Sequence, residues 1–227
     1  MKAGSGDHES RLRRAASTLG IDINDDQVRM LLVYLEQMQR WNRVYNLTAL
    51  RSLDQFLVQH VFDSLAVLQP LRQELANANV LAEGQMVVDV GSGAGLPGIV
   101  LGIMVPQWQV HCVDAVDKKM AFVRQMAGVL GLPNLHALHA RIESVAPFNA
   151  DVVISRAFAS LGDFAVLAGF HVSPEGCLLA MKGRKPEEEI AALQQNTDWS
   201  ARRVDTLVVP ELDAQRCLVW MRRQRNP

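Results

Sequence analysis

The sequence is short of cysteine, of clustered metal ligands and of net charge, and each shortage excludes a class of protein. Three cysteines among 227 residues, odd in number and far apart, form no disulfide framework and predict reduced thiols. The six histidines are scattered, and no set of Cys, His and acidic residues has the spacing of a metal site, so we expect no bound metal. A net charge of −1 lacks the basic excess that is typical of nucleic-acid-binding proteins.

Long hydrophobic runs are missing as well. No apolar stretch reaches the ~18 residues that span a bilayer, and the first ten residues lack the apolar segment of a signal peptide. With 49% hydrophobic and 21% charged residues, the composition is typical of a globular chain. We therefore expect a cytoplasmic monomer without membrane contact, and 227 residues allow one large domain with a small addition.

The patterning divides the chain into three parts. Residues 1–10 carry no pattern and are expected to be flexible, and residues 11–83 show apolar positions at helical spacing without a convincing strand. Residues 84–227 alternate β-branched runs with helical segments, which predicts a mostly parallel sheet covered on both faces. The expected strands are 86–90, 109–114, 135–138, 151–155, 176–182, 203–209 and 215–221. The link between the last two is too short for a crossover helix, so those two strands should pair antiparallel.

A glycine-rich loop follows the first expected strand. Four glycines occur within the eight residues 91–98, and an apolar helical pattern comes next. Glycine permits tight turns and a close approach of the backbone to a ligand, and a helix N-terminus offers free N–H groups. The order of strand, loop and helix predicts a nucleotide-cofactor site at Gly91, Gly93 and Gly95.

Two cofactors fit this loop. From Gly93 onward it matches the G-x-G-x-x-G dinucleotide fingerprint, and from Asp89 onward it is the acidic-first loop typical of S-adenosylmethionine (SAM) methyltransferases. The Asp89 carboxylate would repel a diphosphate, whereas it favours the ammonium and sulfonium of SAM. We therefore favour SAM. An NAD(P)-dependent oxidoreductase stays the alternative, although the chain has no Tyr-x-x-x-Lys pair.

Two acids downstream fit a nucleoside cofactor. Asp114 ends the second expected strand about 20 residues past the loop, the usual place for a carboxylate that binds a ribose. Capping of the next helix is the other interpretation of Asp114. Glu143 follows the third expected strand and is placed to accept a hydrogen bond from an adenine amino group, unless it is a solvated surface carboxylate.

Several short motifs occur in one order along the chain. They are WNRVYNLT at 41–48, HVFDS at 60–64, GSGAGLPG at 91–98, ISRAFASL at 154–161 and MKG at 181–183. Together they resemble the RsmG (GidB) family of bacterial methyltransferases of small-subunit ribosomal RNA, over about residues 20–222. The resemblance implies a Rossmann-like, SAM-dependent methyltransferase fold: a seven-stranded, mostly parallel sheet with an antiparallel last strand and an N-terminal helical extension.

The resemblance also implies a reaction. It is the methylation of guanine N7 at position 527 of 16S rRNA, in the 530 loop, with 16S rRNA or the small ribosomal subunit as partner. The SAM contacts of the family then fall on Gly91, Leu96, Ile142, Glu143 and Arg156. Ala115 departs from the family, which often has Ser there, so any hydroxyl contact to the ribose is lost or replaced.

The residues after the fourth expected strand favour direct, in-line methyl transfer. Guanine N7 has a free lone pair, so the transfer needs positioning and control of charge but no base. Exocyclic-amine methylases usually carry Asn/Asp-Pro-Pro-aromatic at this place, where Ser155-Arg156-Ala157-Phe158 stands here, and no cysteine is near for a covalent route. Arg156 is the expected catalytic residue, because an arginine directly after a buried strand seldom serves packing; a structural ion pair is its alternative.

The substrate contacts are less sharply marked. Phe158 is expected to stack on an unstacked guanine, or else to pack in the core. Lys182 and Arg184 follow the fifth expected strand and either bind phosphate or lie in a solvated turn. Two further functions stay open. The protein methylates another RNA, or it is an RNA-binding assembly factor with a vestigial loop, and a methyl-transfer assay distinguishes the two.

The helical part offers two residue pairs whose roles stay open. Trp41 and Tyr45 lie one helical turn apart and either face RNA or pack on the sheet. His60 and Asp63 share a helix face and are expected to hydrogen-bond to each other.

Overall fold

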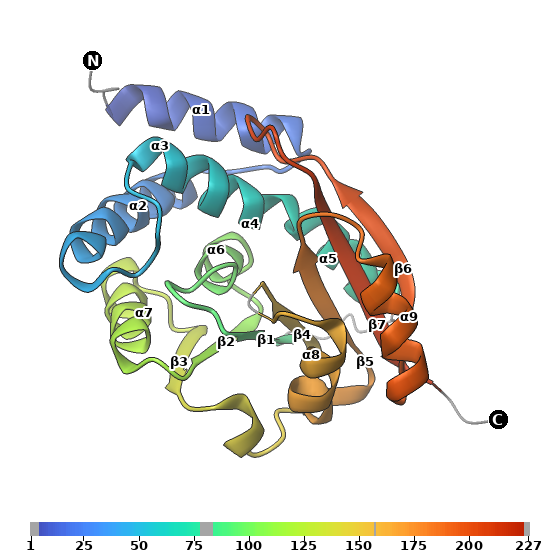
Figure 1. Cartoon of the computed structure of the whole chain (residues 1–227). Coiled ribbons are helices and arrows are strands. Elements are labelled where there is room, and N and C mark those ends of the chain that lie inside the picture. The colour runs from blue at the N-terminus through green and yellow to red at the C-terminus, as the bar shows by residue number, and fades with distance from the viewer. Residues whose placement is uncertain (1–4, 78–83, 157, 225–227) are drawn as a thin grey trace.

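The computed structural model describes residues 5–77, 84–156 and 158–224. Figure 1 shows a central sheet with helices on both faces. Parts of the predicted segments 1–10, 11–83 and 84–227, and residue 157 of the fourth-strand motif, lie outside the described residues.

The N-terminal part is helical, and its helices lie together over one face of the sheet (Figure 1). They are α1 (Ser5–Thr18), α2 (Asp25–Tyr45), α3 (Leu53–Phe56), the π-helix η1 (Leu57–Phe62), α4 (Asp63–Ala66) and α5 (Leu68–Asn77). α2 begins with a capping box, in which the side chains of Asn24 and Gln27 accept each other's backbone N–H. Such reciprocal capping satisfies two N–H groups that the first turn leaves free.

The first helix begins earlier than the sequence predicts. α1 starts at Ser5, so helical structure covers the second half of the segment 1–10, for which we expected no pattern. Arg11 ties this helix to two distant segments, because its guanidinium pairs with Asp54 and, at 2.7 Å, with Glu211. His8 adds a contact of 3.3 Å from Nε2 to Asp54 Oδ1. These partners lie more than forty residues away, which is why no local pattern marks the start of the helix.

Seven strands form one sheet in the order β3-β2-β1-β4-β5-β7-β6. They are β1 (Met86–Val90), β2 (Gln109–Asp114), β3 (Leu135–His139), β4 (Ala150–Ser155), β5 (Val172–Lys182), β6 (Trp199–Leu207) and β7 (Arg216–Arg223). Neighbours from β3 to β5 pair parallel, and β7 runs antiparallel to both β5 and β6. The predicted mostly parallel sheet with a reversed last strand is confirmed.

Two strands differ from the sequence prediction at their ends. β5 begins four residues early because Val172 pairs with Ala150 before a register shift, and the next pair joins Val152 to Cys177. The intervening Gly176 lies so close to β4 that an added Cβ would meet the Ala150 carbonyl oxygen at 2.6 Å. β6 covers Trp199–Leu207 instead of 203–209. It is an edge strand whose pairing with β7, and not its own hydropathy, sets its bounds.

The sheet is buried on both faces, and alternate residues of each strand enter different cores. In β1, Val87 packs with the N-terminal helices, α6 (Gly98–Met104) and α7 (Asp117–Leu130), whereas Val88 packs with α8 (Leu161–Ala168) and α9 (Glu187–Asn196). The helical part therefore shares one core with the sheet. Among the helices in the described part of the chain, none has both the length and the apolar character needed to cross a membrane.

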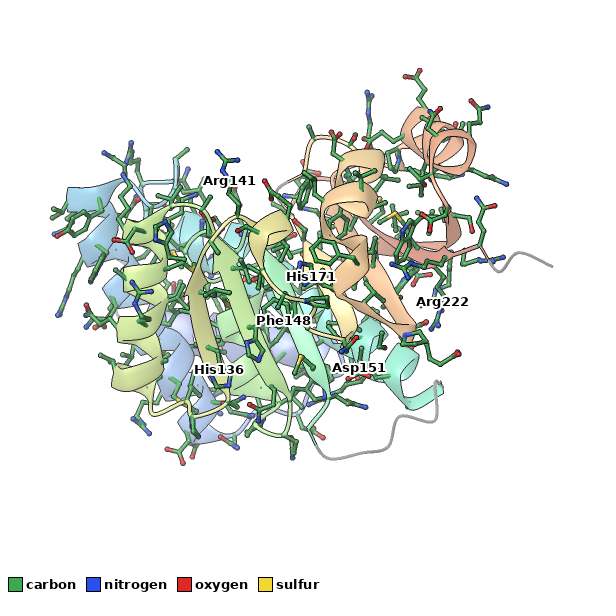
Figure 2. All side chains as sticks on the ribbon, turned by 90° about the horizontal axis from the view of Figure 1, so that it is seen from below. His136, Arg141, Phe148, Asp151, His171 and Arg222 are labelled. Carbon is green, nitrogen blue, oxygen red and sulfur yellow. The ribbon has the colours of Figure 1, made fainter. Side chains whose placement is uncertain are left out.

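The face that carries α8 also holds a row of rings beneath the carboxyl ends of the strands. His136 stacks on His111 at 4.5 Å, Phe148 lies 5.1 Å from His111, and His171 lies 5.2 Å from Phe148 (Figure 2). His171 Nε2 hydrogen-bonds to the Ile142 carbonyl at 2.9 Å. The row thereby anchors the short 3₁₀ turn η2 (Ile142–Ser144) at the end of the sheet where the glycine loop lies.

Candidate active site

The glycine loop connects β1 to α6 through a backbone that only glycine adopts without strain. Gly91, Gly93 and Gly95 have φ values of 68°, 60° and 85°. The loop is tied to the end of β2, since the Gly91 N–H donates to the Val113 carbonyl at 2.8 Å and the Gly93 N–H to Asp114 Oδ2 at 2.9 Å. The loop and the second-strand acid thus form one hydrogen-bonded unit.

Asp89 lies in β1, just before this loop. The residue is fully buried, and its Oδ2 accepts the Gly98 N–H at 2.8 Å, at the start of α6. Burial raises the pKa of the Asp89 carboxyl to about 7, against the effects of the Gly98 hydrogen bond and the Arg156 charge. Asp89 therefore shapes the turn into the helix, and its contact with a SAM cation stays a prediction.

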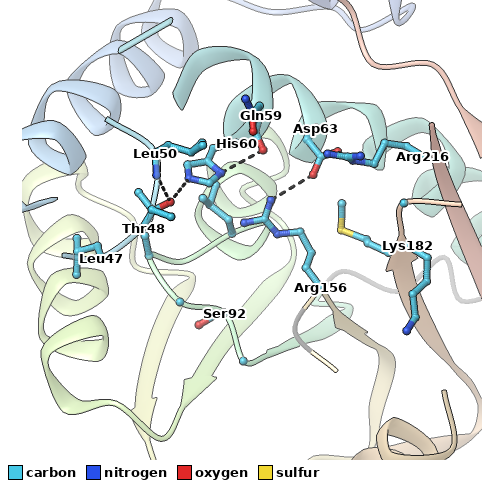
Figure 3. A pocket seen from close by; sticks show the side chains of 17 residues that line it. Leu47, Thr48, Leu50, Gln59, His60, Asp63, Ser92, Arg156, Lys182 and Arg216 are labelled. Carbon is cyan, nitrogen blue, oxygen red and sulfur yellow. Dashed lines mark hydrogen bonds and ion pairs between the residues drawn. The ribbon is translucent and has the colours of Figure 1, made fainter. Parts of the chain in front are cut away.

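Two pockets open on either side of the loop, and both are lined by Gly91. The first, which we call the loop pocket, has a volume of about 550 Å³ and lies between the glycine loop, the N-terminal helices and the ends of β4, β5 and β7 (Figure 3). The second, the strand-end pocket, has a volume of about 260 Å³ and lies over the ends of β1 to β3. A ligand that crosses Gly91 has room on both sides.

The strand-end pocket gathers the predicted nucleoside contacts. Its lining includes Asp114, Ile142, Glu143 and Phe158. Asp114 Oδ1 also accepts the Val116 N–H at 2.9 Å, just before α7, although the N-cap of that helix is Val116 and not Asp114. Ribose binding by Asp114 stays a prediction. Phe158 stacks on Phe164 of α8 at 5.0 Å, packs partly buried against the core on that face, and lines the strand-end pocket but not the loop pocket.

Arg156 reaches the loop pocket from the end of β4 and is held by an acid of the N-terminal helices. Its Nη1 donates to Asp63 Oδ2 at 3.2 Å, and Arg216 of β7 donates through Nε to the other oxygen at 2.8 Å (Figure 3). The Asp63 side chain is 4% exposed, and the two arginines are about a quarter exposed. Two guanidinium groups on one carboxylate leave a net positive charge at the pocket wall.

His60 lines the same pocket in its neutral form. Burial and the nearby Arg156 lower the pKa of His60 to about 4. Its Nδ1 lies 3.1 Å from the Gln59 carbonyl, which assigns the ring proton to Nδ1, so Nε2 accepts from the Thr48 hydroxyl at 3.1 Å (Figure 3). The expected hydrogen bond between His60 and Asp63 is therefore wrong, because each side chain has other partners.

Lys182 lines the loop pocket, but its ammonium is shared among protein groups. Nζ donates to Glu189 at 2.8 Å and to the carbonyls of Phe158 and Ala159 at 3.3 and 3.2 Å. Lys182 thus fastens the segment after β4 to α9. Arg184, two residues on, lines a third hollow that is described below.

The N-terminal helices support the glycine loop from outside. The Tyr34 hydroxyl, fully buried in α2, donates to the Ala94 carbonyl at 2.8 Å. Trp41 packs 5.4 Å from Phe122 of α7, which confirms packing for this residue, while Tyr45 lies against it at 4.8 Å and is 43% exposed. The helical extension therefore forms part of the site wall.

Sequence reasoning missed several residues of the loop pocket. Thr48 and Gln59 line it, and they occur within or beside motifs that carried only a family resemblance. Asp63 lines it as well, although the sequence suggested only a hydrogen bond with His60 for this residue. No sequence feature pointed to Arg216, because it is the first residue of β7, whose sequence has the pattern of an ordinary strand. Gly95 and Asp89 line neither pocket, whereas Gly93 and Leu96 line the loop pocket. Within the described residues, no three His, Cys, Asp or Glu side chains lie close enough to hold a metal ion.

Comparison with known proteins shows to which family the chain belongs. The family GidB, rRNA small subunit methyltransferase G, matches residues 27–219. A ribosomal RNA small subunit methyltransferase G of Bordetella petrii is 59% identical over 97% of this chain and 85% of its own length. One from Acidovorax sp. is 48% identical over 94% of this chain and 95% of its own length. The chain belongs to the rRNA small subunit methyltransferase G family.

Solved structures show the same fold at low sequence identity. A ribosomal protein L11 methylase of Lactobacillus delbrueckii subsp. bulgaricus matches with a TM-score of 0.52 and 14% identity, over 69% of this chain and 79% of its own. TrmN of Thermus thermophilus matches with a TM-score of 0.50 and 16% identity, over 74% and 53%. The predicted Rossmann-like methyltransferase fold and the resemblance to the methyltransferase G family are both confirmed.

Proposed function

We propose that this protein transfers a methyl group from SAM to guanine N7 at position 527 of 16S rRNA, by direct in-line attack. Membership of the methyltransferase G family supports the class of reaction and the ribosomal substrate. The observation that carries the site is the pair of pockets that meet at Gly91, one lined by nucleoside-binding residue types and the other by arginines. We propose that the enzyme is cytoplasmic, in keeping with an rRNA substrate, and that the enzyme acts as a monomer.

The pockets suit SAM in size and donor type. Asp114 is 7% exposed and lines the strand-end pocket together with Gly91, and a carboxylate there suits a ribose diol. Ile142, Glu143 and Phe158 supply an apolar wall, an acceptor and an aromatic face for an adenine. Gly91, Gly93 and Leu96 would hold the methionine end at the loop pocket, with Arg156 near its carboxylate, while Asp89 and Gly95 act by shaping the loop.

SAM supplies the methyl group as an electrophile, and the chain's own residues have to position the base. The guanine N7 lone pair needs no deprotonation, and the loop pocket provides none of the groups of a covalent route. All three cysteines are buried and free, none lines the loop pocket, and burial raises the pKa of Cys177 to about 12. Arg156 is the proposed catalytic residue, because it lines the loop pocket, where its guanidinium would donate to guanine O6 and leave the N7 lone pair free, or to the cofactor carboxylate.

The decisive experiment is tritiated methyl transfer from SAM to small ribosomal subunits from cells that lack this gene. Free 16S rRNA and large subunits are the controls, and cleavage at N7-methylguanine maps the product. Label at one guanine of the small-subunit RNA is the expected result. SAM binding without transfer would overturn the ribosomal substrate, and binding of NADH in place of SAM would overturn the cofactor assignment.

A further inference from the structure

A basic groove adjoins the loop pocket. It has a volume of about 610 Å³ and lies between the segment that leads into α9 and the strands β6 and β7. Five cationic residues line it: Arg184, Lys185, Arg202, Arg203 and Arg216. No acidic residue lines the groove within the described part of the chain. In a protein whose net charge is −1, this is a local concentration of positive charge.

The cations of the groove differ in how far protein acids already neutralise them. Arg203 pairs with Glu74 at 3.2 Å and with Asp205 at 2.9 Å, and Arg216 pairs with Asp63 as described above. Lys185 has an exposed partner 3.1 Å away in Glu187. Arg184 and Arg202 are exposed, and neither has an ion-pair partner among residues 5–77, 84–156 and 158–224.

The groove is continuous with the loop pocket. Gly183 and Arg216 line both hollows, so a chain that enters the loop pocket can pass directly into the groove. A guanine that is methylated at N7 inside a pocket has to leave its stack, which makes its flanking nucleotides locally single-stranded. Their phosphates then need cations near the pocket mouth, and an arginine fork suits phosphate oxygens.

We propose that the basic groove binds the phosphate backbone of the RNA strand next to the target nucleotide, with Arg184 and Arg202 as the principal contacts. This inference rests on the proposed function, since the loop pocket has to receive the target guanine. Thr206 and Gln215 line the groove as neutral donors to phosphate or sugar. Arg216, shared by the two hollows, is the point where backbone binding and the active site meet.

The test compares three double variants of the full chain. Arg184→Ala with Arg202→Ala removes the two unpaired cations, and Arg184→Lys with Arg202→Lys keeps their charge. The matched control is Arg14→Ala with Arg29→Ala, which removes the same charge from exposed positions on α1 and α2. Methyl transfer to unmodified small subunits, SAM binding, and binding of a labelled single-stranded RNA dodecamer are each measured between 50 and 200 mM KCl.

The groove alanine variant should lose about tenfold in kcat/KM through a higher KM, with kcat at saturation and SAM affinity kept. The slope of log Kd for the dodecamer against log salt should fall by about 1.4, because each phosphate contact on a single strand contributes about 0.7. The lysine variant and the control should stay within about twofold of the wild-type protein, as expected when charge at this place is what matters.

The possible failures are distinguishable. If the wild-type protein does not methylate small subunits, the proposed function fails and this inference falls with it. If the wild-type protein methylates them and the groove alanine variant behaves like the control, only the groove is overturned. A loss of transfer to subunits with unchanged dodecamer binding would also overturn it, because the occupant would then be an acidic protein surface on the subunit.

Discussion

Asp63 accepts a hydrogen bond from Arg156 at 3.2 Å, although the two residues are 93 positions apart in the chain. Asp63 belongs to the helical extension and Arg156 to the end of β4, so the extension supplies a side chain that fixes the proposed catalytic arginine. The same carboxylate holds Arg216 at 2.8 Å. The position of both guanidinium groups therefore depends on one buried acid.

Asp63→Asn should weaken methyl transfer more than it weakens the fold. The amide keeps the shape of the side chain but accepts from one arginine only, and it removes the negative charge between two cations. We expect unfolding free energy to fall by about 1–3 kcal/mol and kcat/KM to fall by about tenfold or more. A SAM affinity that is kept would assign Arg156 to the guanine, and a lowered one would assign it to the cofactor carboxylate. Asp26→Asn is the control, since Asp26 pairs with Arg29 in an exposed surface contact. Equal behaviour of the two variants would contradict a positioning role for Asp63.

Gly98→Ala should destabilise the protein by about 1–3 kcal/mol. An added Cβ would lie 2.4 Å from Cys112 Sγ and 3.0 Å from Asp89 Oδ2, and both neighbours are fully buried. Gly128→Ala in α7 is the matched control, because a Cβ there meets nothing within 4 Å and alanine favours the helix by about 1 kcal/mol. Urea unfolding of both variants checks the pair. Partial rescue of Gly98→Ala by Cys112→Ala would identify the sulfur as the obstacle.

Asp89→Asn should stabilise the protein most at high pH. The folded pKa of about 7 lies above the unfolded value of 3.8, so the folded state binds the additional proton between these pH values. Stability is therefore lost as pH rises from about 4 to 7, by up to about 1.4 kcal/mol per pH unit for this group. Asparagine mimics the protonated form and does not titrate. The gain of Asp89→Asn over the wild-type protein in urea unfolding should be larger at pH 8 than at pH 5, and an equal gain at both would refute the shift.

Phe158→Ala should lower the affinity for SAM and leave the KM for small subunits unchanged. Phe158 lines the strand-end pocket with Asp114 and Glu143, and it is braced by Phe164. Loss of an aromatic face against an adenine costs about 1–3 kcal/mol, or roughly five- to a hundredfold in Kd. Calorimetric SAM titration and subunit kinetics separate the alternatives. A raised subunit KM with normal SAM binding would instead support stacking on the target guanine.

Local patterns were sufficient for much of the fold and for half of the site. The β-branched runs placed β1, β2, β3 and β4 within a residue, because their hydropathy follows from burial in the sheet, whereas β5 begins four residues before its predicted start. The glycine loop, Asp114, Ile142 and Glu143 fall together at the strand ends, since parallel strands bring their carboxyl ends to one edge. The edge strand β6 was misplaced by up to four residues, because partner pairing fixes its bounds and leaves little trace in its own sequence.

The sequence by itself determined the fold class, the glycine loop and the family, because hydropathy periods, glycine positions and motif order are properties of contiguous residues. Only the tertiary structure decided what each charged side chain faces. Asp89 hydrogen-bonds to the start of α6, Arg156 pairs with Asp63, and Phe158 lines the strand-end pocket. The reason is physical: the partner of a charge or a ring is chosen by packing between segments that lie tens of residues apart, and no local pattern encodes that choice.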